Sequence, residues 1–256
     1  MTKLVVYYRV SDTPAYKDKK KPVYVNNETC LANFLKNFCP ENLHVIADSV
    51  NDQTGEFLNK IRKKYAFDVE HVQNKSGSKT FSHVFHLALQ NMDGDIVYFV
   101  EDDYLHLPRS KELLLEAFKE TEADYVTLYD HPDKYVNSKD GGPNPFIKHG
   151  GELTRVIKTS SSHWKKTNST TLTFAARVRT LREDQKEWKR CVSSNVPNDF
   201  LVFVRLNKSR FFYRPFKRKR ILIHPVPGRA THGEADFLTP FCDWESVAEL
   251  KKKDSS

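Results

Sequence analysis

The sequence predicts an α/β protein with a mostly parallel central sheet, helices on both faces of that sheet, and a single domain. Short apolar runs alternate with segments whose apolar residues recur at the helical spacing, which is the order of parallel strands joined by crossover helices. The chain has 256 residues, of which 39% are hydrophobic and 12% aromatic. It can therefore bury one large core, and it is too apolar for a disordered or fibrous chain.

The alternation of strands and helices is clearest in the first half of the chain. After the apolar run Leu4–Tyr8, the residues Leu31, Phe34, Leu35 and Phe38 recur at the spacing of one helix face. The expected elements, in chain order, are strand 4–8, helix 31–38, strand 44–46, helix 57–65, strand 68–72, helix 81–92, strand 96–100, helix 108–118 and strand 125–129.

The second half of the chain has a weaker pattern. Residues 138–169 are rich in Gly, Pro, Asn, Ser and Thr, so we expect little regular structure there. The pattern then resumes with strand 170–175, helix 182–190, helix 200–206 and strand 221–224, and the tail 251–256 is expected to fray.

Composition narrows the class of protein. No apolar run approaches the roughly 18 residues of a membrane-spanning helix, and the first residues lack the apolar core of a signal peptide. We therefore expect no transmembrane segment and a cytoplasmic location. The four cysteines occur singly, which predicts reduced core residues rather than a disulfide scaffold or a zinc site.

Three consecutive acids, Glu101-Asp102-Asp103, follow the apolar strand 96–100. Adjacent carboxylates at a strand end repel one another unless a cation lies beside them, and Mg²⁺ and Mn²⁺ prefer carboxylate oxygens while leaving positions open for phosphates. The simpler interpretation is an exposed acidic turn. The buried strand before the acids, with Tyr104 and Pro108 after them, favours a metal or substrate site, because ligands bind beyond the carboxyl ends of such strands.

The run Val97–Asp103 resembles the strand and Asp-x-Asp type motif of glycosyltransferases with the GT-A fold, a Rossmann-like architecture. The resemblance covers the element order from Leu4 to Tyr129 and continues more loosely to Trp244. It implies a UDP- or GDP-linked sugar donor and a glycan, glycoprotein or lipid-linked acceptor. It also implies a donor-binding half, residues 1–130, and an acceptor-binding and catalytic half, residues 131–250, within one domain.

The resemblance implies a metal site as well. Carried over position by position, Asp103 would bind Mn²⁺ or Mg²⁺, while Asp102 and Glu101 would contact the ribose or a metal-bound water. A metal placed there stabilises the charge that develops on the departing diphosphate. Family members supply a late histidine to the metal, which implies His232 in its turn-rich loop. A lone histidine is more often structural, and His224, at the end of an apolar strand, is the competing candidate that we expect to be buried.

Further donor contacts are implied at other strand ends. Tyr8 and Arg9 follow the first strand, where the family binds the base and ribose, and Asp48 closes the second strand. Lys79 lies ahead of the third helix, where it and the helix N-terminal amides can meet a phosphate. Arg229, in a Pro-Gly loop, is favoured over the Arg218 cluster as a phosphate contact.

The base that deprotonates the acceptor hydroxyl should be a carboxylate in the second half. Asp199, at the start of an apolar helix, is the first candidate. Glu183 and Asp184 match the Glu-Asp pair of many family members, but their charged neighbours are typical of a solvated helix. One base opposite the leaving group implies inversion at the anomeric carbon. His163, Trp164 and Trp244 are possible sugar-stacking contacts, although packed tryptophans are at least as common.

The alternative function is a nucleic-acid-binding protein or a metal-dependent nuclease. The formal charge is +8, and the segment 205–220 is basic and interleaved with aromatic residues, as nucleic-acid surfaces are. A solvated basic face, with Lys217–Arg220 on the outside, explains the same run. Nucleotidyltransferases need a Gly-rich loop after the first strand, and dinucleotide-binding proteins need a G-x-G-x-x-G motif. Neither pattern is present.

Overall fold

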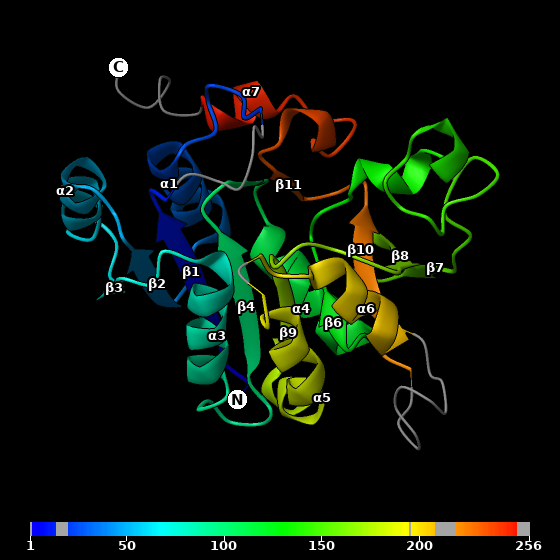
Figure 1. Ribbon diagram of the computed structural model, residues 1–256, viewed down its shortest axis with the longest axis horizontal. Helices are drawn as coiled ribbons and strands as arrows, with labels where there is room; N and C mark the ends of the chain where they lie inside the picture. Colours follow the sequence, from blue (N-terminus) through cyan, green and yellow to red (C-terminus); the bar gives the residue numbers. More distant parts are fainter. Residues whose placement is uncertain (1, 14–19, 195, 208–218, 250–256) are drawn as a thin grey trace.

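The computed structural model describes residues 2–13, 20–194, 196–207 and 219–249. A central sheet has the strand order β3-β2-β1-β4-β9-β6-β10-β8-β7 (Figure 1). Its strands are β1 (Leu4–Ser11), β2 (Asn42–Asp48), β3 (Asp68–Val72), β4 (Ile96–Glu101), β6 (Tyr125–Val126), β7 (Val156–Lys158), β8 (His163–Thr167), β9 (Phe174–Arg177) and β10 (Leu222–Val226). Only β8 and β9 pair antiparallel with both neighbours, so the prediction of a mostly parallel sheet is confirmed.

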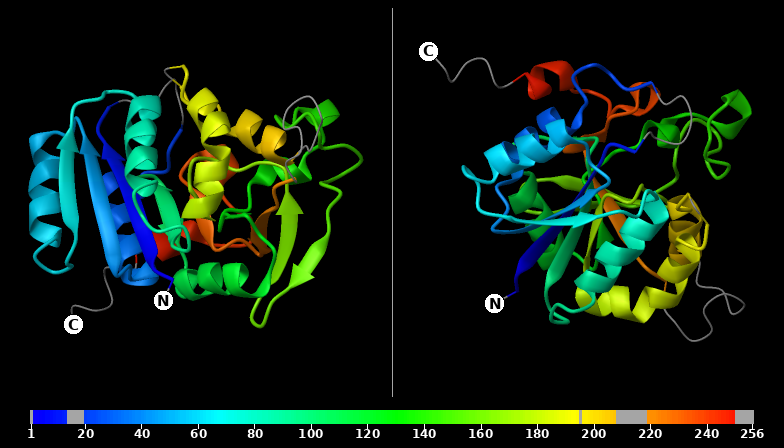
Figure 2. Two further views of the ribbon diagram at one scale, coloured as in Figure 1. Left: turned by 90° about the horizontal axis from the view of Figure 1, so that it is seen from below. Right: turned by 60° about the vertical axis from the view of Figure 1, so that its left-hand side comes forward.

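Helices cover both faces of the sheet, as the sequence predicts (Figure 2). One face carries α1 (Asn27–Phe38), α2 (Asp52–Ile61) and α4 (Ser110–Glu120). The other carries α3 (Gly77–Ala88), α5 (Val178–Cys191) and α6 (Asp199–Asn207). A short last helix, α7 (Trp244–Ala248), packs on α1.

The three layers follow from strand alternation and helix spacing. Tyr8 of β1 faces the α1 core, where its ring lies 5.3 Å from that of Phe34. Its neighbour Tyr7 faces the opposite core, together with Phe81 of α3, because successive strand side chains point to opposite faces. Asn26, Asn51 and Ser76 cap α1, α2 and α3 by accepting a hydrogen bond from a first-turn N–H group, which satisfies donors that a helix leaves unpaired.

Two pairs of strands depart from the sequence prediction. Residues 138–169, expected to be irregular, contain the hairpin β7–β8, and Trp164 of β8 is fully buried. A separate two-stranded ribbon joins β5 (Tyr104–His106) to β11 (Ala230–His232). Neither is visible as a local pattern, because β7, β8 and β11 are short and polar and their pairing is fixed by distant partners.

Several strands end together at one edge of the sheet. The parallel registers align Ser11 with Asp48 across β1 and β2, and Arg9 with Glu101 across β1 and β4. This carboxyl edge, where β11 and α7 also lie at the top of Figure 1, therefore holds the acids singled out in the sequence. Among the residues described, no helix is long and apolar enough to cross a membrane.

Candidate active site

The ribbon β5–β11 brings the two expected metal ligands together. Tyr104 pairs with His232 across the ribbon, so Asp103, the residue before β5, lies beside that histidine. The Nε2 atom of His232 is 3.2 Å from Oδ2 of Asp103. A contact between two residues so far apart in the sequence depends on this strand pairing.

The acid Glu101 has a fixed partner. Its Oε1 lies 3.3 Å from a guanidinium nitrogen of Arg9, and the Thr173 hydroxyl donates to its Oε2 over 3.2 Å. The Arg9 guanidinium also lies 5.3 Å from the centre of the Phe81 ring. Salt bridge, hydroxyl and aromatic ring together fix the direction of the Glu101 carboxylate.

Asp102 is held from the neighbouring strand. The backbone N–H of Ser11 donates to its Oδ2 over 2.7 Å. Burial, and then the negative charge of Asp103, raise the pKa of Asp102 to about 7. Two carboxylates side by side without enough cation cannot both ionise freely. Burial and the neighbouring charge therefore disfavour ionisation of Asp102.

The basic neighbours of Asp103 contact only one of its two carboxylate oxygens. Its Oδ2 lies 2.9 Å from Nζ of Lys21 as well as beside His232. Its Oδ1 is buried with no hydrogen-bond partner among the described residues. Burial opposes ionisation of Asp103, but His232 and Lys21 outweigh it and hold its pKa far below the usual range.

These residues fit a hard divalent cation in part. Two cis ligands of an octahedral ion, each about 2.1 Å from it, lie about 3 Å apart, close to the 3.2 Å between Asp103 and His232. The unpartnered Oδ1 adds a second oxygen. Within the described ranges, no third His, Cys, Asp or Glu joins them in a metal-binding group. Substrate phosphates and water would have to supply the other ligands.

Asp48 is buried and fully engaged by the loop after β3. Its Oδ1 accepts from the backbone N–H groups of Asn74 and Lys75 at 2.8 and 3.1 Å, and the Thr80 hydroxyl donates to its Oδ2. Burial works against its charge, but these hydrogen bonds lower the Asp48 pKa. Asp48 therefore positions the start of α3, where Lys79 is exposed in the first turn.

Tyr8 and Arg229, expected to contact the donor, have side chains that are engaged elsewhere in the fold. The Tyr8 ring is fully buried, so it is not available to a base or ribose. Arg229 donates a hydrogen bond to the carbonyl of Pro108, and its backbone pairs at the end of the ribbon away from His232. The reason is strand alternation: within β1 and beside β11, neighbouring residues face opposite sides.

Asp199 begins α6 on the same edge as the acids. Asn198 caps the helix by accepting from the N–H of Leu201 over 3.1 Å, and Pro197 packs near Gly77, the first residue of α3. Burial raises the pKa of the Cys191 thiol to about 12, and the negative charges of Asp199 and Glu101 both add to it. The charges of Asp199 and Glu101 are therefore both felt at one buried thiol.

The alternative pair, Glu183 and Asp184, lies at the amino edge of the sheet. Arg220 donates to both oxygens of Asp184, over 2.8 and 3.0 Å, and to Oε2 of Glu183 over 2.5 Å. Asp124, just before β6, lies 3.2 Å from the same guanidinium. Glu183 is exposed, as expected of a solvated helix residue. Two expectations are corrected, because Asp184 on the same helix is buried and Arg220 is buried rather than on an outer face.

The remaining histidine and aromatic candidates divide between core and surface. His224 is buried, as expected, with its Nε2 3.5 Å from Oδ1 of Asp130. Trp164 and Trp244 are also buried, so they pack in the core rather than line a sugar site. His163 is exposed at the start of β8.

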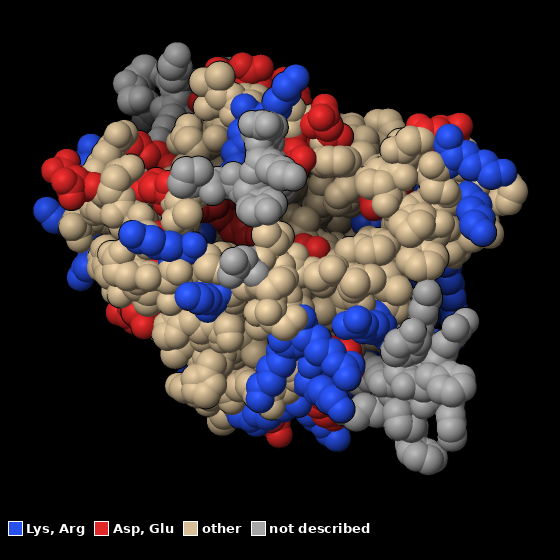
Figure 3. Space-filling model, in the orientation of Figure 1, with Lys and Arg blue, Asp and Glu red and all other residues tan. Residues whose placement is uncertain are grey.

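Charge is unevenly distributed on the surface. Figure 3 shows a hollow with acidic side chains in it over the upper part of the sheet, and basic side chains gathered lower down, over α5. Several of the latter are paired, as Arg179 is with Glu183 and Arg182 with Asp93. Most of the basic segment behind the nucleic-acid alternative, residues 208–218, lies outside the described residues.

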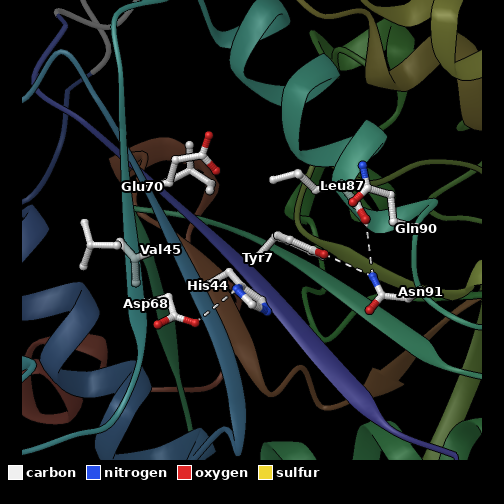
Figure 4. Close-up of a pocket in the computed structure, with 10 residues that line it drawn as sticks. Tyr7, His44, Val45, Asp68, Glu70, Leu87, Gln90 and Asn91 are labelled. Carbon is white, nitrogen blue, oxygen red and sulfur yellow. Dashed lines mark hydrogen bonds and ion pairs between the residues drawn. The ribbon is translucent and has the colours of Figure 1, made fainter.

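A second hollow lies away from the acids. It has a volume of about 350 Å³ and lies between the amino ends of β2 and β3 and the end of α3 (Figure 4). Tyr7 stacks on His44 there, with ring centres 5.3 Å apart, and Asn91 donates to the Tyr7 hydroxyl over 3.0 Å. The hollow opens at the edge of the sheet opposite to Asp103.

Sequence comparison decides the family. Residues 22–179, more than half of the 256, match the model of glycosyl transferase family 2. The chain belongs to this family. No curated protein sequence matches the chain significantly. The match includes the acids Glu101–Asp103 and ends before His232, which the structure adds through the ribbon.

The fold of this chain is similar to that of a solved glycosyltransferase structure. GalNAc-T7 with UDP, GalNAc and Mn²⁺ has a TM-score of 0.56 at 9% identity over 90% of this chain and 43% of its own. TarS 1–349 from S. aureus has a TM-score of 0.43 at 16% identity, over 72% of this chain and 49% of its own. The chain thus spans about half the length of these structures. The GT-A fold expected from Val97–Asp103 is confirmed.

Two residues of the site were not anticipated. Lys21 is one of several lysines in a polar stretch, and Thr173 is one of several threonines between residues 167 and 173. Each gains its role only through a contact with Asp103 or Glu101. No local pattern distinguishes them from their neighbours.

Proposed function

We propose that this family 2 chain is a metal-dependent glycosyltransferase that moves a sugar, a hexose or a pentose, from a UDP- or GDP-linked donor to the hydroxyl of a glycan, glycoprotein or lipid-linked acceptor. The observation that carries the proposal is the pairing of Asp103 with His232 at the carboxyl end of β4. Its support is the family match and the GT-A fold shared with GalNAc-T7, a protein solved with UDP and Mn²⁺.

The roles of the residues follow from their geometry. Asp103 and His232 would hold Mn²⁺ or Mg²⁺, which neutralises the departing diphosphate when bound. Arg9 and Thr173 hold Glu101 in place, where it would contact the ribose of the donor. Asp48 holds the loop before α3, so that Lys79 and the first amides of that helix face an incoming phosphate.

Asp199 is the proposed base, and residues 131–250 are the proposed acceptor-binding half. Asp199 is the first residue of α6, and a carboxylate can act as the general base that accepts the proton of the acceptor hydroxyl. One carboxylate acting opposite the leaving group predicts inversion. Glu183 and Asp184 are left out of this step, because Arg220 holds them at the other edge of the sheet.

The test is calorimetry of UDP and GDP binding in Mn²⁺ and in EDTA. Wild-type protein should bind one of them much more tightly with metal. Asp103→Asn should remove that difference while circular dichroism and the melting temperature show a folded protein. Asp236→Asn, in the turn after β11, is a matched control that should behave as wild type. Equal affinity in EDTA and Mn²⁺ would show that the metal assignment is wrong.

A further inference from the structure

Two cations neutralise the acids in different ways. The Arg9 side chain is 9% exposed and is held by both Glu101 and the Phe81 ring. The Lys21 side chain is 33% exposed and forms an ion pair with Asp103. A lysine carries its charge on a flexible stem and can return to water, whereas the planar arginine fork fixes its partners. Arg9 is therefore a permanent counter-ion, and Lys21 is free to exchange.

Residues 20–25, which carry Lys21, pack against Asp103 and the segment after β11. The backbone N–H of Ala235 donates to the carbonyl of Lys20 over 2.8 Å. A Cβ added at Gly233 would lie 2.2 Å from a methyl group of Val25 and 2.8 Å from the carbonyl oxygen of Asp103. Only glycine permits this close approach. The lysine thus reaches Asp103 because loop, ribbon and acid are packed together.

Lys21 stands where a divalent cation would bind. Its Nζ and Nε2 of His232 both approach Oδ2 of Asp103, at 2.9 and 3.2 Å, while Oδ1 has no partner within the described ranges of the chain. A cation held between Asp103 and His232 would bond to this oxygen. Like charges in a largely buried site repel strongly, so ammonium and metal cannot share it.

We propose that Lys21 is an exchangeable counter-ion, which neutralises Asp103 in the unloaded protein and leaves this carboxylate when a divalent cation binds. The inference rests on the proposed function, because it takes Asp103 and His232 as the metal site. Metal alone therefore binds weakly. A nucleoside diphosphate strengthens metal binding, since its phosphates give the displaced ammonium a new anionic partner.

The experiment is a Mn²⁺ titration of the full chain without nucleotide, with free Mn²⁺ measured by electron paramagnetic resonance. Lys21→Met keeps the length of the side chain and removes its charge, and should tighten Mn²⁺ binding by about tenfold, the scale of one charge-assisted hydrogen bond. Lys20→Met removes a charge from the exposed neighbour and should leave the affinity unchanged. In an Asp103→Asn background, Lys21→Met should have no effect.

Addition of UDP completes the test. It should tighten Mn²⁺ binding to wild-type protein more than to Lys21→Met, because only the wild type has an ammonium to release. Unchanged or weaker Mn²⁺ binding in Lys21→Met, checked against Lys21→Gln, overturns the counter-ion role and leaves the metal site intact. Failure of Mn²⁺ to bind either protein, even with UDP, overturns the metal-dependent function as well.

Discussion

Two acidic clusters lie at opposite edges of the same sheet, and they differ in how completely they are paired. At the amino edge, Arg220 is 5% exposed and its guanidinium hydrogen-bonds Asp124, Glu183 and both oxygens of Asp184. At the carboxyl edge, Asp103 keeps one buried oxygen that has no partner among the residues described and shares the other between Lys21 and His232. The first arrangement is a structural salt-bridge network, and the second leaves a carboxylate oxygen available to a ligand.

The comparison teaches that residue type does not separate the two roles. Both clusters contain three acids with basic partners, and both Glu183-Asp184 and Glu101-Asp102-Asp103 match acidic motifs of glycosyltransferases. What differs is the cation. An arginine fork saturates carboxylate oxygens in fixed directions, while a lysine satisfies one contact and leaves the rest open.

The largest expected effect is on turnover. Asp199→Asn should lower kcat by about a thousandfold, the usual scale of acid–base catalysis, with donor affinity retained. Glu183→Gln, in the saturated cluster, should lose little activity. The assay follows sugar transfer with each variant and assigns the anomeric configuration of the product by NMR. A retained anomer would contradict the inverting mechanism, and full activity in Asp199→Asn would contradict the role of Asp199 as the base.

The next effect is on stability. Asp184→Asn removes a buried partner of Arg220 and should cost about 3 kcal/mol of unfolding free energy. Asp103→Asn should cost less, because it also relieves repulsion with Asp102 and because the partly exposed Lys21 can return its charge to water. Urea unfolding of both variants without metal measures the two losses. Equal losses would mean that the two clusters are built alike.

A smaller effect separates the two late histidines. His232→Ala should weaken Mn²⁺-dependent nucleotide binding by about tenfold, a typical cost of perturbing a metal site, with little change in melting temperature. His224→Ala, which empties a buried site beside Asp130, should mainly lower the melting temperature. Calorimetry and thermal melts on the same samples make the comparison. The opposite pattern would move the ligand role to His224.

The smallest effect concerns pH. Burial lowers the pKa of His106 to about 3, against about 6.5 when unfolded. The unfolded chain therefore binds an extra proton between these values, and stability falls as pH decreases through that range, by at most about 1.4 kcal/mol per pH unit. His106→Gln should flatten the dependence between pH 6 and about pH 5, as followed by urea unfolding. The exposed His86→Gln is the control and should keep the wild-type slope.

Much of the fold of residues 1–130 was predictable because its signals are local. The spacing of Leu31, Phe34 and Phe38 places them on one helix face, and the apolar run before Glu101 marks a central strand. The parallel order of β3, β2, β1 and β4 then follows from the alternation of elements. The sequence therefore predicts correctly that Glu101–Asp103 lie at the carboxyl edge of the sheet.

The rest depended on long-range pairing. The ribbon brings His232 to Asp103, but nothing near residue 21 indicates that Lys21 joins them. Tyr8 and Arg229 were misplaced because a one-residue change along a strand reverses the direction of a side chain. Glu183 and Asp184 matched a motif, and only the position of Arg220 distinguishes them from a catalytic pair.

The β5–β11 ribbon also makes the contact between Asp103 and His232 a sign of completed folding. The segment that matches the family model ends at residue 179 and so contains Asp103 but neither β10 nor β11. Contacts between residues more than a hundred positions apart close large loops and form slowly. A nascent or clipped chain that holds only the first part would present the acids without the histidine. Activity at this centre is thereby coupled to the arrival of the last quarter of the polypeptide.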